Sequence, residues 1–134
     1  MNRTLLTTLM LAMTLSASAT DYTLTSPDGR LRSVISTGAT TTFTLSTSHQ
    51  QVLAPSAIAM HIAGKGIWGH NTQRAKVRRQ KTDVTISSPL YRRATVRDQY
   101  NALTLQLKGY DVQFRMYDDG LAYRFVGHMP DSVI

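Results

Sequence analysis

Apolar and polar residues alternate over several short segments of this chain. In residues 103–107 and 112–116 every second residue is apolar, and the residues between them are polar or charged. A period of two predicts a β-strand that buries one face, and residues 42–46, 58–62 and 84–86 show the same period. No segment after the first twenty positions sustains a helical spacing of apolar residues. The pattern therefore predicts an all-β protein.

Turn-forming residues separate these strands at short intervals. Glycine supplies the positive φ of a tight turn, and asparagine and aspartate can hydrogen-bond their own backbone. We expect turns at residues 26–29, 64–66, 100–102, 109–111 and 118–120, and the last three would join four strands in a meander from about residue 94 to residue 126. One-faced antiparallel strands must bring their apolar faces together, so the expected fold is an antiparallel β-sandwich, with a barrel as the alternative.

The first nineteen residues have a different pattern. Arg3 precedes an apolar stretch at residues 5–15, and the small residues Ala17, Ser18 and Ala19 follow it. This order is typical of a secretory signal peptide, so we expect cleavage after Ala19 and export of the protein. A retained membrane anchor is the less favoured alternative, because the apolar stretch is short for a membrane span. Residues 20–134 would then form one domain of 115 residues with no attachment to a membrane.

Composition narrows the class of protein further. The chain has no cysteine, so an exported domain must fold here without disulfides.

The net charge of the chain is +7, and loss of Arg3 would leave +6, with the basic residues concentrated at positions 74–81 and 92–97. Export argues against nucleic acid as a partner, and no aromatic residues are interleaved with these arginines to stack bases. We therefore interpret these two basic segments as exposed residues at the edge of a sheet, in contact with solvent.

The acidic residues are the first candidates for catalysis. A glycosidase needs two carboxyl groups roughly 5 to 10 Å apart across a cleft. The adjacent Asp118 and Asp119 would point to opposite faces of an extended strand, so Asp118-Asp119-Gly120 is predicted to close a hairpin instead. The chain has no glutamate, and its eight acidic residues are Asp21, Asp28, Asp83, Asp98, Asp111, Asp118, Asp119 and Asp131. We assign no catalytic residue.

Metal and nucleophile motifs are also absent from the sequence. The histidines His49, His61, His70 and His128 are far apart in the chain and lack the short spacing of metal ligands. No Asp-x-Asp-x-Asp calcium loop and no Gly-x-Ser-x-Gly nucleophile motif occurs. We therefore expect no metal site and no cofactor within this chain.

Trp68 is the remaining candidate for ligand binding. It stands in the glycine-rich stretch GKGIWGH, residues 64–70. Its ring could be a platform for a sugar, because aromatic faces pack well on the C–H face of a sugar ring. The favoured alternative is an anchor that packs this loop onto the sandwich or onto a neighbouring domain.

Five segments together resemble a known family. They are YTLTSPDGRL at residues 22–31, LAPS at 53–56, YRRATVRD at 91–98, YNALTL at 100–105 and YDDGLAYRF at 117–125. In this order and spacing they resemble the N-terminal domain of glycoside hydrolase family 97. The likeness runs from Tyr22 to about Val126, and the last segment is its most distinctive part.

The resemblance implies an exported, calcium-dependent enzyme of the bacterial periplasm that acts on α-linked sugars, such as an α-glucosidase or α-galactosidase. It implies a galactose mutarotase-like β-supersandwich that packs on a (β/α)8 barrel, with a small β domain after it. In the family the barrel carries the catalytic carboxylates and most calcium ligands, and a glutamate ligand comes from a later part of the sandwich. This chain has neither barrel nor glutamate, so no catalytic or calcium residue is carried over.

Three hypotheses follow. In the first, the chain is the non-catalytic front part of the sandwich, expected to be incomplete because Val133-Ile134 resembles the start of another strand, and it braces and borders the active site of a barrel in the same polypeptide. In the second, it is a freestanding exported carbohydrate-binding or interaction module. The candidate sugar contacts would then be Trp68, Tyr91, Tyr110 and Tyr123. In the third, the arginine clusters form a basic surface that binds anionic polymers.

Overall fold

The computed structural model describes residues 19–87, 89, 92 and 95–128. Their regular structure is entirely β. The strands are β1 (Thr20–Thr25), β2 (Leu31–Thr37), β3 (Thr41–Thr47), β4 (Gln51–Ile58), β5 (Met60–Ile62), β6 (Gly66–Trp68), β7 (Lys76–Ser87), β8 (Thr95–Leu107), β9 (Tyr110–Tyr117) and β10 (Gly120–Gly127). Within these described residues no helix is long and apolar enough to cross a membrane. Residues 1–18, Tyr91 and residues 129–134 lie outside the described part, so the signal peptide and its cleavage stay predictions.

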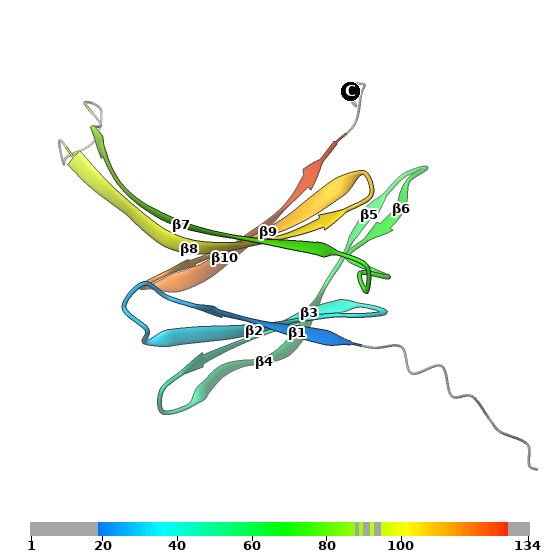
Figure 1. Ribbon diagram of the computed structural model, residues 1–134, viewed down its shortest axis with the longest axis horizontal. Coiled ribbons are helices and arrows are strands. Elements are labelled where there is room, and N and C mark those ends of the chain that lie inside the picture. The colour runs from blue at the N-terminus through cyan, green and yellow to red at the C-terminus, as the bar shows by residue number, and fades with distance from the viewer. Residues whose placement is uncertain (1–18, 88, 90–91, 93–94, 129–134) are drawn as a thin grey trace, which may run out of the picture.

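The strands form two antiparallel sheets that face each other (Figure 1). One sheet has the order β1-β2-β3-β4, the other has the order β10-β9-β8-β7, and β5 and β6 form a separate hairpin beside them. The second sheet is curved, and its concave side faces away from the first sheet (Figure 1). The predicted all-β antiparallel sandwich is confirmed.

The apolar faces of the two sheets form the core. Ile35 of the first sheet and Leu103, Leu105, Val112 and Phe114 of the second are completely buried. Burial of each such side chain stabilises the fold by about 1.5–3 kcal/mol. The burial of β9 alternates residue by residue, as the period-two pattern predicted.

The turn predicted at residues 100–102 is wrong. These residues lie in the middle of the continuous 13-residue strand β8, which pairs with β7 from Thr95 to Gln106. Asn101 does not bond its own backbone: its side-chain Nδ2 donates to the carbonyl oxygen of Thr25 in the other sheet, at 2.8 Å. The region from residue 95 to residue 127 therefore contains three strands rather than the four predicted.

The single strand predicted at residues 58–62 is divided. Ile58 ends β4 opposite Thr41, whereas Met60 begins β5 opposite Trp68, so the two ends belong to different sheets. Gly69 approaches this break closely, and a Cβ atom at that position would lie 2.5 Å from the Ile58 carbonyl oxygen. Alternation alone carries no information about such a change of partner.

Other expectations agree with the structure. Turns occur at Ser26–Gly29, between β5 and β6, at Lys108–Gly109 and at Asp118–Asp119. The basic residues of positions 76–81 lie on β7, the outer strand of its sheet, and are mostly exposed.

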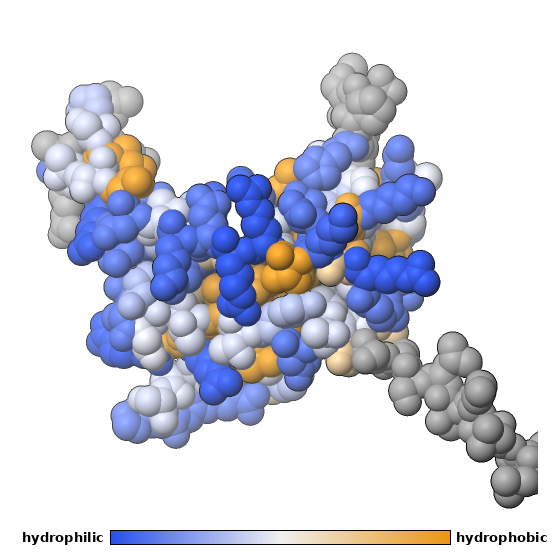
Figure 2. Space-filling view, in the orientation of Figure 1, coloured by the Kyte–Doolittle hydropathy of each residue, from blue (hydrophilic) through white to orange (hydrophobic). Residues whose placement is uncertain are grey.

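Figure 2 shows the predominantly hydrophilic surface, with apolar side chains between the two sheets and at the far end of the β7–β8 hairpin. That end exposes Val84, Ile86 and Val96.

Candidate functional site

Polar and aromatic side chains gather on the concave outer face of the β7–β10 sheet. The pairings of Tyr100 with Thr82 and of Arg115 with Ala102 and Ala122 place these residues on the face opposite the core. We call Tyr100, Gln113, Arg115, Tyr117 and Arg124 the outer-face cluster. It draws on β8, β9 and β10, so it exists only when the sheet has formed.

Two tyrosines and one arginine form the tightest part of this cluster. The Cζ atom of Arg115 lies 4.5 Å from the centre of the Tyr100 ring, which is a cation–π geometry. The Tyr100 and Tyr117 ring centres are 5.3 Å apart and tilted by 53°. The neighbouring Tyr117 side chain raises the pKa of Arg115 above its ordinary value. Arg115 is therefore a cation whose guanidinium group lies over the Tyr100 ring.

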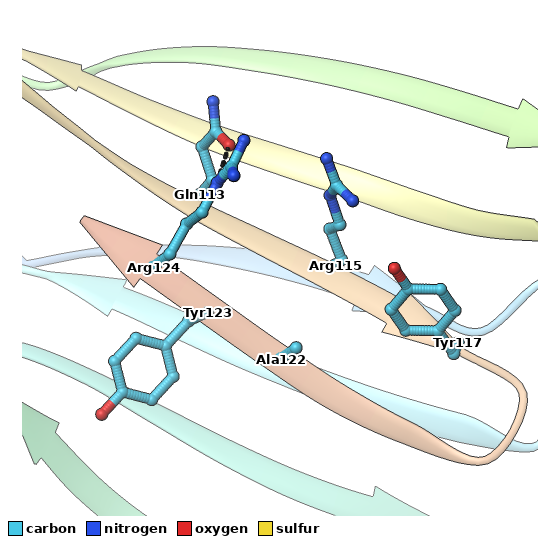
Figure 3. A pocket seen from close by; sticks show the side chains of 6 residues that line it. All are labelled: Gln113, Arg115, Tyr117, Ala122, Tyr123 and Arg124. Atoms are coloured by element: carbon cyan, nitrogen blue, oxygen red, sulfur yellow. Dashed lines mark hydrogen bonds between the residues drawn. The ribbon is translucent and has the colours of Figure 1, made fainter. Parts of the chain in front are cut away.

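A small hollow separates Arg115 from Arg124 (Figure 3). Ala122 lies between them, and its short side chain leaves a cavity of about 160 Å³. The Nε atom of Arg124 donates to the Oε1 atom of Gln113 at 2.7 Å, which orients both side chains. Typical ligand pockets have volumes of roughly 300–1,000 Å³. This hollow therefore suits one inserted side chain or one polar group of a sugar rather than a whole oligosaccharide.

Only part of this cluster could be predicted from the sequence. Alternation in residues 112–116 placed Gln113 and Arg115 opposite the core. It could not place Tyr100, because a turn was predicted there, nor show that Arg124 meets Gln113 across β10 and β9. Cross-strand register is a long-range property, so it has no local signature.

Trp68 lies in a packed environment. It is 8% exposed, and its ring stacks on Tyr110 with centres 4.7 Å apart and planes 4° apart. The Tyr110 hydroxyl accepts a hydrogen bond from the backbone N–H of Gly69 at 2.9 Å. Both of these candidate sugar contacts thus have ring faces used in packing. Tyr123 is 46% exposed and packs on Phe43, with ring centres 5.6 Å apart.

Asp118 and Asp119 form the turn between β9 and β10, as predicted. The Oδ1 atom of Asp118 accepts a hydrogen bond from the backbone N–H of Asp28 at 2.9 Å, which ties this turn to the turn between β1 and β2. Asp28 in turn accepts hydrogen bonds from Ser26 and Arg30, and the Ser26 hydroxyl is the first cause of its lowered pKa. Asp28 and Asp118 therefore serve loop structure here.

The described residues do not fit the calcium ion that the resemblance implies for the whole enzyme. Among them no three Asp or His side chains lie close enough together to hold a metal ion. Asp28 and Asp83 each form an ion pair with an arginine, at 2.6 and 2.8 Å.

Comparison with known proteins places the chain in a family. The family model described as Glycosyl-hydrolase 97 N-terminal matches residues 24–133. The chain belongs to this family. This glycosyl-hydrolase 97 N-terminal domain is 41% identical over 116 residues to a retaining alpha-galactosidase of Bacteroides thetaiotaomicron, an alignment that covers 84% of this chain and 18% of that protein.

Solved structures agree with this assignment. A Glycoside Hydrolase Family 97 enzyme from Pseudoalteromonas sp. strain K8, in complex with acarbose, aligns with a TM-score of 0.64 and 27% sequence identity. The same values hold for a structure of a family 97 enzyme from that organism in complex with panose. Each alignment covers 78% of this chain and 17% of the solved one, so the domain spans less than a fifth of the relatives that it matches.

Proposed function

We propose that this glycosyl-hydrolase 97 N-terminal domain is the non-catalytic β-sandwich part of an exported, periplasmic glycoside hydrolase that acts on α-linked sugars. Its partner is a (β/α)8 barrel of the same polypeptide, which supplies the catalytic carboxylates and binds calcium. The domain braces that barrel and borders its active site. The match to the family over residues 24–133 carries this proposal, and the relative's description as a retaining alpha-galactosidase supports the substrate class.

The use of the carboxylates supports a non-catalytic role. A glycosidase pair must face a common cleft, at a separation of roughly 5 to 10 Å. Asp28 and Asp118 are instead joined to backbone and side-chain donors in two surface turns, and Asp83 is paired with Arg97 by two hydrogen bonds of 2.8 Å. These carboxylates are already engaged in maintaining local structure.

The outer-face cluster is the described surface best suited to border the barrel. Arginine and tyrosine are enriched where proteins meet, because they combine a large contact area with hydrogen bonds. Arg115 and Tyr117 offer this combination on a curved sheet, and the hollow over Ala122 can receive a side chain (Figure 3). Contact at this face would fix the domain relative to the barrel.

A chimaera tests the proposal. The matching segment of the Bacteroides alpha-galactosidase is replaced by residues 20–134 of this chain, and hydrolysis of p-nitrophenyl α-galactoside is measured. We expect activity from the chimaera, none from residues 20–134 alone, and loss of activity when EDTA removes calcium. Hydrolysis by residues 20–134 alone, or a folded chimaera without activity, would refute the proposal.

Variants of the chimaera locate the contact with the barrel. Replacement of Arg115 and Tyr117 by alanine is expected to lower the thermal midpoint and the activity together. The matched control compares Arg115→Ala alone with Arg32→Ala, which removes an exposed arginine of the opposite sheet. Equal effects of these two single variants would exclude a special role for this face.

A freestanding carbohydrate-binding module is the second candidate function. The half-buried Arg115 and Tyr117 beside the hollow at Ala122 favour it, because aromatic and guanidinium groups are common contacts for sugars. It predicts that residues 20–134 bind panose or another α-linked oligosaccharide in calorimetry, with loss of binding in Tyr117→Ala. Absence of binding by the unaltered chain would leave the first proposal as the only candidate.

A further inference from the structure

A second hollow lies at the end of the molecule that carries the β5–β6 hairpin. We call it the end groove, and its volume is about 540 Å³. Three separate segments enclose it: the β5–β6 hairpin, the residues that lead into β7, and the turn between β8 and β9. Basic side chains from all three line it, namely Lys65, His70, Arg74, Lys76 and Lys108.

The charge of the end groove is not balanced within its walls. Among the described residues that line it there is no aspartate. Asp111 does not line the groove but pairs across the strands with the lining residue Gln106, and its Oδ2 atom lies 3.0 Å from the Nε2 atom of His128. Figure 2 shows strongly hydrophilic side chains over this end of the molecule. Four permanent positive charges thus border one hollow, and their mutual repulsion favours an anion between them.

The floor of the end groove is rigid and partly apolar. Trp68 and Tyr110 contribute to it, and their two rings are stacked with centres 4.7 Å apart. The hydrogen bond from the Gly69 backbone to the Tyr110 hydroxyl holds this pair in place. Ile67, which is 45% exposed, adds apolar surface to the wall. A ligand with an apolar face and negative groups at its rim matches both parts of the groove.

Amide groups complete the lining. Asn71 and Gln106 also face the groove, and Gln106 pairs across the strands with Lys76. Amides can donate to and accept from hydroxyl groups, whereas lysine and arginine donate to carboxylate or sulfate oxygens with charge-assisted hydrogen bonds. Hydroxyls, oxyanions and an apolar ring face occur together in an acidic sugar.

We propose that the end groove binds an anionic oligosaccharide, one that bears carboxylate or sulfate groups. The choice of a carbohydrate rests on the proposed function of the domain, whereas the negative charge of the ligand follows from the lining alone. The site is distinct from the outer-face cluster, since the two sets of lining residues do not overlap.

Titration calorimetry on residues 20–134 tests this inference. The probes are hexagalacturonate, an α-linked acidic oligosaccharide, and maltohexaose, a neutral α-linked one of the same length. We expect hexagalacturonate to bind and maltohexaose not to bind, with affinity that falls as salt is added. The double variant Lys65→Gln, Lys108→Gln is expected to raise Kd at least about tenfold, because two charge-assisted hydrogen bonds are lost.

The control variant removes two positive charges elsewhere. Arg32→Gln, Arg78→Gln lowers the net charge equally but lies outside the groove, so it is expected to change Kd less than about twofold. Equal weakening by both variants, or no binding by the unaltered chain, would overturn the site. Binding of inorganic sulfate or of poly-aspartate as tight as that of hexagalacturonate would overturn the carbohydrate ligand.

The hydrolysis assay on the chimaera keeps the two proposals apart. Lys65→Gln, Lys108→Gln is expected to leave hydrolysis of the neutral p-nitrophenyl α-galactoside unchanged. Absence of hexagalacturonate binding by the unaltered residues 20–134, together with full hydrolysis by the unaltered chimaera, would count against the end groove alone. An inactive unaltered chimaera would count against the proposed function alone. Circular dichroism spectra of both double variants verify that they are folded.

Discussion

Arg79 of β7 donates a hydrogen bond from Nη1 to the backbone carbonyl oxygen of Thr23 in β1, at 2.6 Å. Asn101 of β8 donates in the same way to the carbonyl oxygen of Thr25. β1 is the outer strand of its sheet, and an outer strand presents unpaired carbonyl groups. Side chains of one sheet therefore donate hydrogen bonds to free carbonyl groups at the edge of the other. The two layers are joined by these hydrogen bonds as well as by the apolar core.

Removal of the Arg79 side chain tests this connection. Arg79→Ala is expected to lower the free energy of unfolding by about 1 kcal/mol, the net worth of one such hydrogen bond. The measurement is urea denaturation followed by circular dichroism. Arg78→Ala, at the neighbouring position on the opposite face of β7, is the matched control and should change stability by less than about 0.5 kcal/mol. Equal losses in the two variants would mean that the Arg79 bond contributes nothing.

Gly69 is expected to be irreplaceable. Its φ is +98°, and a Cβ atom would lie 2.5 Å from the Ile58 carbonyl oxygen. Gly69→Ala combines backbone strain of about 1–3 kcal/mol with this steric clash, so a loss of at least 3 kcal/mol or failure to fold is expected. Gly64→Ala is the control, since Gly64 has φ +71° and open space around a Cβ. A thermal midpoint no lower for Gly69→Ala than for Gly64→Ala would contradict this account.

The Asp28 turn makes stability depend on pH. Hydrogen bonds from the Ser26 hydroxyl and from Arg30 hold the pKa of Asp28 well below its ordinary value. Because the pKa is lower in the folded state, the carboxylate stabilises the fold above the unfolded pKa of about 3.9, and this contribution is lost as the pH falls toward the folded pKa. The free energy of unfolding should therefore fall more steeply for the unaltered protein than for Asp28→Asn between about pH 4 and pH 2.

Ser26→Ala gives the comparison for this pH effect. This variant removes the hydroxyl that donates to Asp28 but keeps the Asp28 carboxylate. The slope of its stability against pH is therefore expected to lie between those of the unaltered protein and Asp28→Asn. Parallel curves for the unaltered protein and Asp28→Asn would show that the turn makes no contribution.

Ser33 is expected to be replaceable with a gain in stability. Its side chain is completely buried in β2, and the Oγ atom has no hydrogen-bond partner among the described residues. A buried hydroxyl without a partner costs about 1–3 kcal/mol, so Ser33→Ala should raise the free energy of unfolding by about 1 kcal/mol. Thr41→Ala is the contrasting variant, since the Thr41 hydroxyl donates to the Gly69 carbonyl oxygen at 2.9 Å, and it should be destabilising. A destabilised Ser33→Ala would reveal a partner for this hydroxyl.

Alternation in the sequence was sufficient for the fold class and for the buried faces of β8 and β9. Leu103, Leu105, Val112 and Phe114 are buried where the period of two placed them. A strand exposes its two faces to different environments, so hydrophobic alternation records that difference directly. The hairpin at Asp118–Asp119 was predictable for a similar reason, because aspartate followed by glycine favours a tight turn.

Tertiary structure alone decided which strands meet and what the remaining polar residues do. Asn101 resembles a turn residue in the sequence, but its side chain bonds the edge of the opposite sheet, and the strand continues through it. The break after Ile58, the outer-face cluster and the end groove likewise depend on contacts between segments distant in the chain. A local pattern reports which side of an element avoids water, whereas register and sheet packing are set by partners that the pattern does not contain.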